Sequence, residues 1–298
     1  MCAWYFLWLV SQPTSFHHVT MIQSSPCPLP TGFQTMRVFL EIALRSFRRQ
    51  MTYRAAALAG LATNFFFGLL RAAVLVALYG EHSEVAGISL QSAVTFTGLS
   101  QAAIAPLSMF HWYDVMRSVY SGEVASDLLK PMSYFRFWLV QDFGRAAASF
   151  IWRSLTIMAG YAVMFDLTYP HNIEQWAVLG LAMLLSWLVS FSWRFLINLA
   201  AFWTPNAIGL NRLFFILSWF LSGFLMPLRY FPDWFVRLCY LTPFPHMVNS
   251  LVEIYLGVLT GHEVFQTLLL QAVWAVCLTL CSQLVLRLGV RRLVILGG

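Results

Sequence analysis

Charged side chains are scarce in this chain of 298 residues, because Asp, Glu, Lys and Arg together make up only 10% of it. Soluble domains carry about 25% charged residues, so too few are present here to cover a water-facing surface. The hydrophobic content is 59% and the mean hydropathy is +0.70. These values predict an integral membrane protein. Long apolar runs without apolar–polar alternation favour helical spans over a β-barrel.

Lysine is also nearly absent, and the single lysine, Lys130, is followed by Pro131. The pattern Gly-x-x-x-x-Gly-Lys-Ser/Thr is therefore missing, which excludes a phosphate-binding loop of that type in this chain. The metalloprotease, serine-hydrolase and dinucleotide-binding patterns are missing too. We therefore expect no catalytic residue, metal or cofactor here. Energy for any driven process would come from another chain or from an ion gradient.

The cysteines show no metal-binding spacing; Cys277 and Cys281 stand four apart in an apolar stretch and are expected to pack against lipid or protein. The net charge of +6 comes from basic residues beside apolar stretches. Such placement favours a role in membrane orientation over nucleic-acid binding.

The first 35 residues differ from the rest of the chain. Residues 1–10 are apolar but too few to span a membrane, and they lack the basic start of a signal peptide. Residues 11–35 are rich in Pro, Ser and Thr, which predicts disorder. We expect Met36 to be the native start and 36–298 to form the transmembrane domain. A genuine but flexible tail is the alternative.

Six apolar windows have the length of a span: 55–79, 90–111, 143–165, 176–202, 207–228 and 264–288. They predict an all-α membrane protein with six transmembrane helices. Residues 36–50 precede the spans with amphipathic helical spacing. Arg45, Arg48 and Arg49 would face lipid headgroups, as in a helix lying on the membrane surface.

Basic residues are distributed unequally between the two sides of these spans. Loops on one side carry Arg37, Arg45, Arg48, Arg49, Arg54, Arg117, Lys130, Arg136, Arg145, Arg212, Arg287, Arg291 and Arg292, whereas the other side has only Arg229 and Arg237. Loops rich in Lys and Arg stay in the cytoplasm. Both termini and the segment 117–137 are therefore predicted to be cytoplasmic.

Polar residues recur at helical spacing on three of the spans. The three sets are Asn64, Gly68 and Arg71; Thr97, Gln101 and Ser108; and Asn211, Ser218 and Ser222. An intramembrane arginine by default faces protein or a water-filled cavity. We interpret these stripes as a candidate pathway or subunit interface. The alternative is hydrogen bonding between helices of one bundle.

Two further arginines lie within predicted spans. Arg194, in the cytoplasmic half of the fourth span, is expected to extend its head toward the membrane surface. Arg153 has no partner that the sequence identifies. No carboxylate inside a predicted span matches Arg71 or Arg153.

The segment 222–257, "SGFLMPLRYFPDWFVRLCYLTPFPHMVNSLVEIYLG", is too apolar for an ordinary loop and too rich in proline to span. Pro227, Pro232, Trp234 and Pro243 are typical of short helices half-sunk in the outer interface. The order Ser-Gly, Pro, Pro-x-Trp, an aromatic stretch and a Pro-containing turn resembles the signature of ABC-2 type transporter permeases. "MRVFLEIALRSFRRQMTYRAAALAGLATNFFFGLLRA" and "GEVASDLLKPMSYF" resemble a branch described as transport-system permease components.

The resemblance covers residues 36–292 and implies a six-span half-permease that pairs with an identical or sister permease. Two copies of a separate ATPase, which hold the ATP and Mg²⁺, would drive it. Most such permeases are exporters in prokaryotic inner membranes. Substrate, direction and homodimer against heterodimer stay open.

The resemblance also makes residues 121–131 a coupling helix that inserts into the ATPase. Gly122 would precede the helix and Pro131 would end it, while Glu123 and Asp127 favour its N-terminal half. Both acids share a face toward basic groups of the partner, with Val124 and Leu128 as a neighbouring apolar edge. A solvated surface helix is the alternative.

Two other functions compete with this one. A stand-alone secondary transporter or channel would need an intramembrane ionisable pair, broken helices or internal repeats. A membrane enzyme would need clustered acids, bases or metal ligands, and the outer-side Asp233, His246, Glu253 and His262 match no such site.

Overall fold

The computed structural model describes residues 32–52, 54–110, 112–130 and 132–292. The chain divides into two units, residues 1–37 and 38–298. Residues 1–31 lie outside the described part, so the separate character predicted for 1–35 stays a prediction.

The described elements are almost all helical. In chain order they are α2 Gly32–Thr52, α3 Arg54–Tyr79, β1 Glu84–Val85, β2 Ile88–Ser89, α4 Leu90–Leu107, α5 Asp114–Tyr120, α6 Glu123–Leu128, α7 Tyr134–Ser149, a π-helix Phe150–Ser154, α8 Leu155–Met164, α9 Ile173–Asn198, a 3₁₀-helix Leu199–Phe202, α10 Ala207–Leu221, a 3₁₀-helix Leu228–Tyr230, α11 Asp233–Tyr240, a 3₁₀-helix Phe244–His246, α12 Asn249–Leu256 and α13 His262–Val290. The two strands form one antiparallel hairpin that pairs Glu84 with Ser89 and Val85 with Ile88.

Three helices in the described residues are long and apolar enough to cross a membrane: Ala57–Tyr79, Ile173–Phe202 and His262–Val290. They match three of the six predicted windows. The other three windows hold shorter or interrupted helices. In the second window the helix ends at Leu107 rather than continuing to 111. The helix of the third window contains the π-helix, and the fifth window holds the 15-residue α10.

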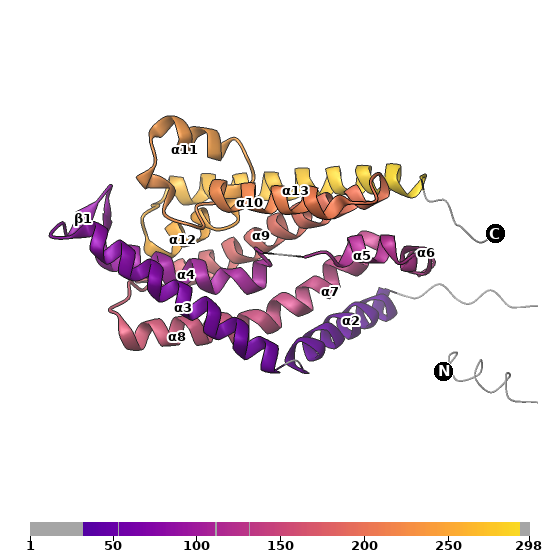
Figure 1. Cartoon of the computed structure of the whole chain (residues 1–298), viewed down its shortest axis with the longest axis horizontal. Coiled ribbons are helices and arrows are strands. Elements are labelled where there is room, and N and C mark those ends of the chain that lie inside the picture. The colour runs from indigo at the N-terminus through magenta and orange to yellow at the C-terminus, as the bar shows by residue number, and fades with distance from the viewer. Residues whose placement is uncertain (1–31, 53, 111, 131, 293–298) are drawn as a thin grey trace, which may run out of the picture. The chain divides into compact units, whose positions relative to one another are not determined.

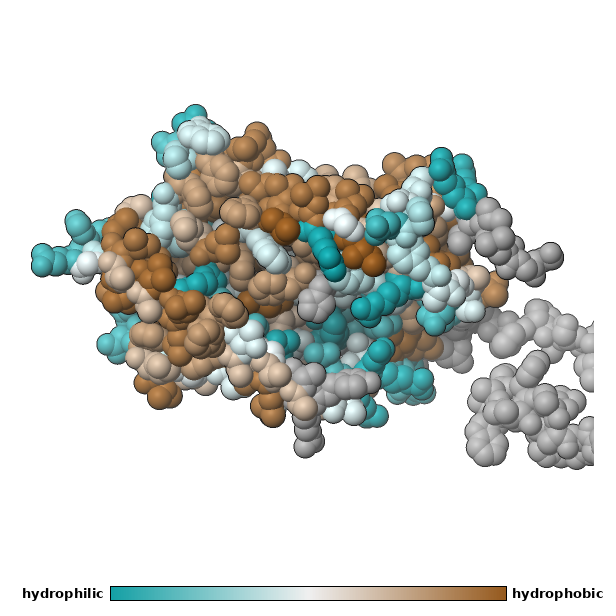
Figure 2. Space-filling view, in the orientation of Figure 1, coloured by the Kyte–Doolittle hydropathy of each residue, from teal (hydrophilic) through white to brown (hydrophobic). Residues whose placement is uncertain are grey.

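Helix α9 lies among α4, α10, α12 and α13, and its aromatic residues build much of the core (Figure 1). Phe191 and Phe195 are fully buried and pack against Phe135 with ring centroids 5.5 and 5.0 Å apart. Side chains on the outer faces of α3, α10 and α13 are apolar and exposed, and brown surface covers much of Figure 2. An apolar exterior of this extent suits contact with lipid.

The third predicted span is a continuous helical run from Tyr134 to Met164, divided by the five-residue π-helix. It starts nine residues before the predicted window, which began at 143. Asp142 therefore lies in the buried middle of α7 rather than in a loop. This shift overturns the expectation that no carboxylate lies among the spanning helices.

Helix α2 contains the amphipathic stretch predicted over 36–50, with Arg45, Arg48 and Arg49 exposed. It meets α7 at a close backbone approach. A Cβ on Gly144 would lie 2.1 Å from the Ala43 carbonyl oxygen, and the Ser46 hydroxyl donates to the Gln141 carbonyl at 2.6 Å. Glycine at 144 is thus required for this packing.

Gly144→Ala is expected to separate α2 from α7 and to lower stability by about 1–3 kcal/mol, the usual cost of overpacking. Gly209→Ala is the matched control, because nothing lies within 4 Å of a Cβ placed there. Thermal unfolding in detergent measures both. Equal melting temperatures for the two variants would contradict the close approach.

Candidate functional site

Helix α4 is interrupted inside the helical bundle, and the interruption starts at Pro106. Proline lacks the N–H that would bond the carbonyl of Ala102 four residues earlier. The Ser154 hydroxyl, at the end of the π-helix, donates to that carbonyl instead, at 2.6 Å. The helix then ends at Leu107, and Ser108 adopts a left-handed conformation with φ 49°.

Four carbonyl groups at and just after this break receive side-chain donors, and that of Ile104 receives the backbone N–H of Met109. Arg145 donates to the carbonyls of Ala105 and Pro106 at 2.8 and 2.9 Å, and Ser190 donates to that of Leu107 at 2.9 Å. Trp219 donates to the Met109 carbonyl at 2.6 Å. Irregular backbone at membrane depth is tolerated only where protein or water satisfies it. Here protein does so.

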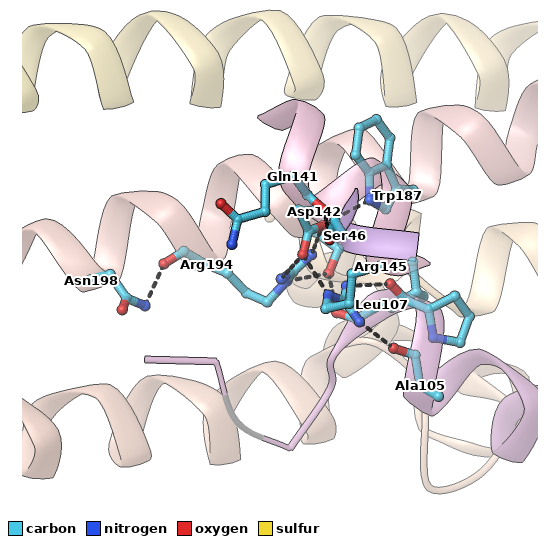
Figure 3. Close-up of polar contacts among 11 residues, drawn as sticks. Ser46, Ala105, Leu107, Gln141, Asp142, Arg145, Trp187, Arg194 and Asn198 are labelled. Atoms are coloured by element: carbon cyan, nitrogen blue, oxygen red, sulfur yellow. Dashed lines mark hydrogen bonds and ion pairs between the residues drawn. The ribbon is translucent and has the colours of Figure 1, made fainter. Parts of the chain in front are cut away.

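A buried ionic cluster holds these donors in place (Figure 3). Asp142 accepts a two-pronged pair of hydrogen bonds from Arg194 at 3.2 and 2.9 Å, and a third from Arg145 at 2.8 Å. Trp187 donates to the same carboxylate at 2.9 Å. The side chains of Asp142 and Arg194 are each 1% exposed. Arg194 is therefore a buried partner of Asp142 and does not reach the surface, contrary to the sequence-based expectation.

The cluster carries one negative and two positive charges. The C-terminal end of α4 supplies the compensating partial negative charge, because helix C-termini end in unpaired carbonyl groups. Arg145 bridges the two, binding both the carboxylate and the helix end. Arg145 was predicted to lie on a cytoplasmic loop but belongs to α7. The arrangement fixes the point at which α4, α7 and α9 meet.

Arg71 also binds backbone carbonyl groups, in the irregular segment that follows α10. Its guanidinium donates to the carbonyls of Phe224 and Leu225 at 2.6 and 2.5 Å and to Ser100 at 3.3 Å. Those two carbonyls follow the end of α10, where Gly223 has φ 72°. The partners of Arg71 are thus backbone groups of the irregular segment.

The segment 222–257 is tied together by Asn249 and Glu253. Asn249 accepts from the backbone N–H of Leu228 and donates to the Tyr240 hydroxyl, both at 3.1 Å. Glu253 pairs with Arg229 at 2.7 Å. Burial, followed by the Glu253 charge, raises the pKa of Tyr240 in α11, so this hydroxyl keeps its proton.

The prolines predicted to shape this segment stand before short helices: Pro227, Pro232 and Pro243 immediately precede the helices that begin at Leu228, Asp233 and Phe244. Trp234 is 68% exposed on α11. The anchoring of Trp234 in the outer interface stays a prediction.

The predicted polar stripes of α3 and α4 meet each other. A Cβ on Gly68 would touch both the Gln101 side chain and the Tyr161 hydroxyl. Thr97 bonds its own helix at the Ala93 carbonyl. Within the described residues, Asn64 Nδ2, Gln101 Oε1 and the Tyr161 hydroxyl have no partner although buried.

The stripe of α10 faces α9 instead. Ser218 accepts from Trp193 at 3.0 Å, and Ser222 donates to the Trp219 carbonyl. Asn211 is buried, and both its amide atoms lack a partner in the described part of the chain. The contact that Ser218 makes with Trp193 is therefore separate from those that join α3 and α4. Burial favours the helix-contact alternative, and a pathway or subunit role stays a prediction.

The longest buried polar stripe was missed. Ser186, Ser190, Arg194 and Asn198 recur every four residues on α9, and all are buried. Asn198 donates to the Trp112 carbonyl and accepts from the Met116 N–H. Asp142 and Arg145 likewise stand one turn apart on α7. The four-residue repeat was visible in the sequence and could have located this cluster.

The segment predicted to contact a partner contains a short helix, α6, preceded by Gly122 with φ 76°. Val124 is fully buried in its own chain, and Leu128 packs against the Phe195 cluster. Asp127 is 13% exposed, paired with Lys130 at 2.6 Å and accepting from Ser118 at 2.9 Å. Pro131 lies outside the described residues.

Among the exposed residues of the described part of this segment, Glu123 and Leu129 offer a charge and a large apolar side chain to another molecule. Glu123 is exposed, and Leu129 is 87% exposed. Asp127, predicted to face basic groups of a partner, is thus engaged inside the chain. Val124 and Leu128, the predicted apolar edge, pack within the chain itself. Whether a partner binds here is untested.

Long apolar helices with buried charges between them define a helical, multi-pass membrane protein. The model of the family described as ABC-2 family transporter protein matches residues 65–297, and the chain belongs to that family. It is therefore a component of membrane transport. Comparison with curated proteins gives no match. Among the described residues, no three His, Cys, Asp or Glu side chains are grouped to hold a metal.

Asp142→Leu is expected to cost about 3–5 kcal/mol, because it leaves Arg194 buried without a counter-charge. Arg194→Met should cost less, since Asp142 keeps Arg145 and Trp187. The double variant should be more stable than the sum of the single losses. Unfolding in detergent measures this cycle, and additive losses would contradict the pairing. Arg212→Met on the exposed face of α10 is the control.

Arg71→Met is expected to destabilise the segment 222–257, because it leaves the carbonyl of the buried Phe224 without its donor, at a cost of about 1–3 kcal/mol. Arg71→Lys should fall between this variant and the natural chain, since an ammonium group retains donors. Melting temperature and limited proteolysis within 222–257 report the effect. Unchanged stability with altered transport would instead assign Arg71 to a pathway.

Proposed function

We propose that this chain is the membrane-spanning permease subunit of an ATP-driven exporter. Family membership over residues 65–297 is the observation that carries the proposal. The missing phosphate-binding lysine loop supports ATP hydrolysis, with its Mg²⁺, on a separate ATPase subunit. Two ATPase copies and a second permease, identical or sister, would complete the assembly.

In this proposal six spans cross the inner membrane of a prokaryote: α3, α4, the run from α7 to α8, α9, α10 and α13. Both termini would be cytoplasmic, because basic residues gather on that side. In Figure 1 the hairpin and α11 lie at one end of the helices and α5 and α6 at the other. This arrangement agrees with an outer segment 222–257 and a cytoplasmic α5–α6.

The ATPase would contact α6 through Glu123 and Leu129. Glu123 offers an exposed carboxylate, which forms no ion pair with the described residues, to a basic partner, and Leu129 offers an exposed apolar side chain. The internal ties of Asp127 and Val124 would keep α6 folded for this contact.

Movement of α6 would pass to the spans through α5. The Tyr120 hydroxyl donates to the Thr204 carbonyl at 3.0 Å and accepts from the Ala207 N–H at 2.8 Å. Asn198, at the end of α9, binds the N-terminal part of α5 through Met116. A shift of α5 would therefore act directly on the junction between α9 and α10.

Glu123→Arg and Leu129→Asp are each expected to lower the affinity for the ATPase about tenfold or more, as for central contacts of an interface. The chain would be co-expressed with an ABC ATPase from the same genome and reconstituted. ATPase stimulation and binding are the readouts. Glu81→Arg, at the hairpin end, reverses a charge as a matched control. Full stimulation in both α6 variants would contradict the contact.

A stand-alone secondary transporter is the second candidate, because α4 is broken beside the buried Asp142 cluster. Broken helices and midplane charges are typical of such carriers. Against it, each carboxylate oxygen of Asp142 already accepts two hydrogen bonds. Ion-driven uptake by the chain alone in liposomes would support this candidate over the exporter.

A further inference from the structure

A long apolar groove opens on the side of the helical bundle. Helix α4 forms its floor, the run from α7 to α8 forms one wall, and α9 with α12 forms the other. The cavity volume is about 580 Å³, within the range of about 300–1,000 Å³ typical of small-molecule sites. Leu155 and Leu184 stand half-exposed at its two walls. The groove is therefore accessible from the lipid side.

The groove has almost no polar lining. Ser154 is its one small hydroxyl residue, and its hydroxyl is already bonded to the Ala102 carbonyl. Trp187, at the Asp142 end, has its indole N–H bonded to Asp142. Gly180 on α9 faces open space, because nothing lies within 4 Å of a Cβ placed there. Such a groove fits a flexible alkyl chain.

A second hollow of about 520 Å³ adjoins the groove at the opposite end from the Asp142 cluster. The two share Ala162, Leu167 and Tyr169 as lining residues, so they are adjacent. The second hollow is also lined by Asp166 and Gln91. An apolar space thus borders one that holds a carboxylate and an amide.

Asp166 supplies the charge at this junction. Its carboxylate is exposed, and no hydrogen bond or ion pair within the described residues engages it. The lining of the second hollow holds no Lys, Arg or His. A cation would meet a free carboxylate there, whereas an anion would be repelled.

We propose that the groove and the adjoining hollow together bind a single-chain cationic amphiphile. Its alkyl chain lies in the groove along α4, and its cationic head lies beside Asp166. This binding site belongs to the chain itself and does not depend on the ATPase partnership proposed above. Each added methylene buried in the groove tightens binding roughly fourfold.

The test is equilibrium binding of radiolabelled alkyltrimethylammonium ions to the purified full chain in nanodiscs, with protein-free nanodiscs subtracted. Affinity should rise from the decyl to the dodecyl compound, whereas dodecyl sulfate should bind at least tenfold more weakly than dodecyltrimethylammonium. Asp166→Asn should weaken the cation about tenfold and leave neutral dodecyl maltoside within twofold. Gly180→Leu should weaken both ligands.

Matched variants separate these effects from general changes. Glu81→Gln removes an exposed carboxylate from the hairpin, and Gly209→Leu adds the same bulk on α10, where a Cβ also meets nothing within 4 Å. Both should bind like the natural chain. Ala159→Leu adds bulk to the opposite wall of the groove. If Gly180→Leu lowers the melting temperature, Ala159→Leu takes its place and should show the same loss of ligand affinity.

Three results would overturn the proposal. Equal affinity for the cationic and anionic ligands would remove the role of Asp166. Unchanged binding in Gly180→Leu and Ala159→Leu would show that the ligand's alkyl chain does not lie in the groove. Tighter binding of lysophosphatidylethanolamine than of dodecyltrimethylammonium would make the occupant a membrane lipid. If the chain bound the cationic ligand as expected but did not stimulate a co-expressed ATPase, that result would count against the proposed function and not against this binding site.

Discussion

The central constraint on this fold is that a backbone carbonyl freed inside an apolar layer must find a donor. Helix α4 ends within the bundle, where Arg145 from α7 binds two carbonyls at its C-terminal end. Arg71 from α3 binds two carbonyls of the irregular segment that follows α10. Each arginine has its donors bound by these carbonyl groups, and each of these carbonyl groups has a donor because the arginine is there. Asp142 completes the arrangement by pairing with both Arg145 and Arg194.

Helix α9 connects these irregular parts through residues spaced four apart. Its stripe reaches the outer segment at Ser186, the broken end of α4 at Ser190, α7 at Arg194 and the start of α5 at Asn198. One helix thus contacts both the predicted outer segment and the predicted partner-facing segment. A rigid displacement of α9 would change all four contacts together, which suits a transporter that alternates between two states.

The class of fold could be predicted from hydropathy, because length and composition alone identify long apolar helices. The partners of Arg71 and Arg194 could not, because they are backbone and side-chain groups far away in the sequence. From the sequence, Asp142 was placed outside the third span, because an apolar window excludes charged residues at its start and therefore began at 143. Helix α7 starts nine residues before that window, at Tyr134. The helix at α6 was predictable from Gly122. The burial of Val124 and the pairing of Asp127 depend on tertiary contacts that local pattern does not contain.

The π-helix at Phe150–Ser154 has a consequence for how this chain can vary. A π-turn holds one residue more than an α-turn, and each residue of an α-helix turns the chain by about 100°. Deleting one residue there would restore a regular α-turn and leave the following residues on nearly the same faces, because the extra residue is contained within that one turn. A deletion inside α8, between Leu155 and Tyr161, has no such turn to absorb it. It would rotate Tyr161 by about 100° away from Gly68 and Gly98, which both lie against its ring. The π-helix is therefore the place in this helical run where a change of one residue in length disturbs the packing of α8 least.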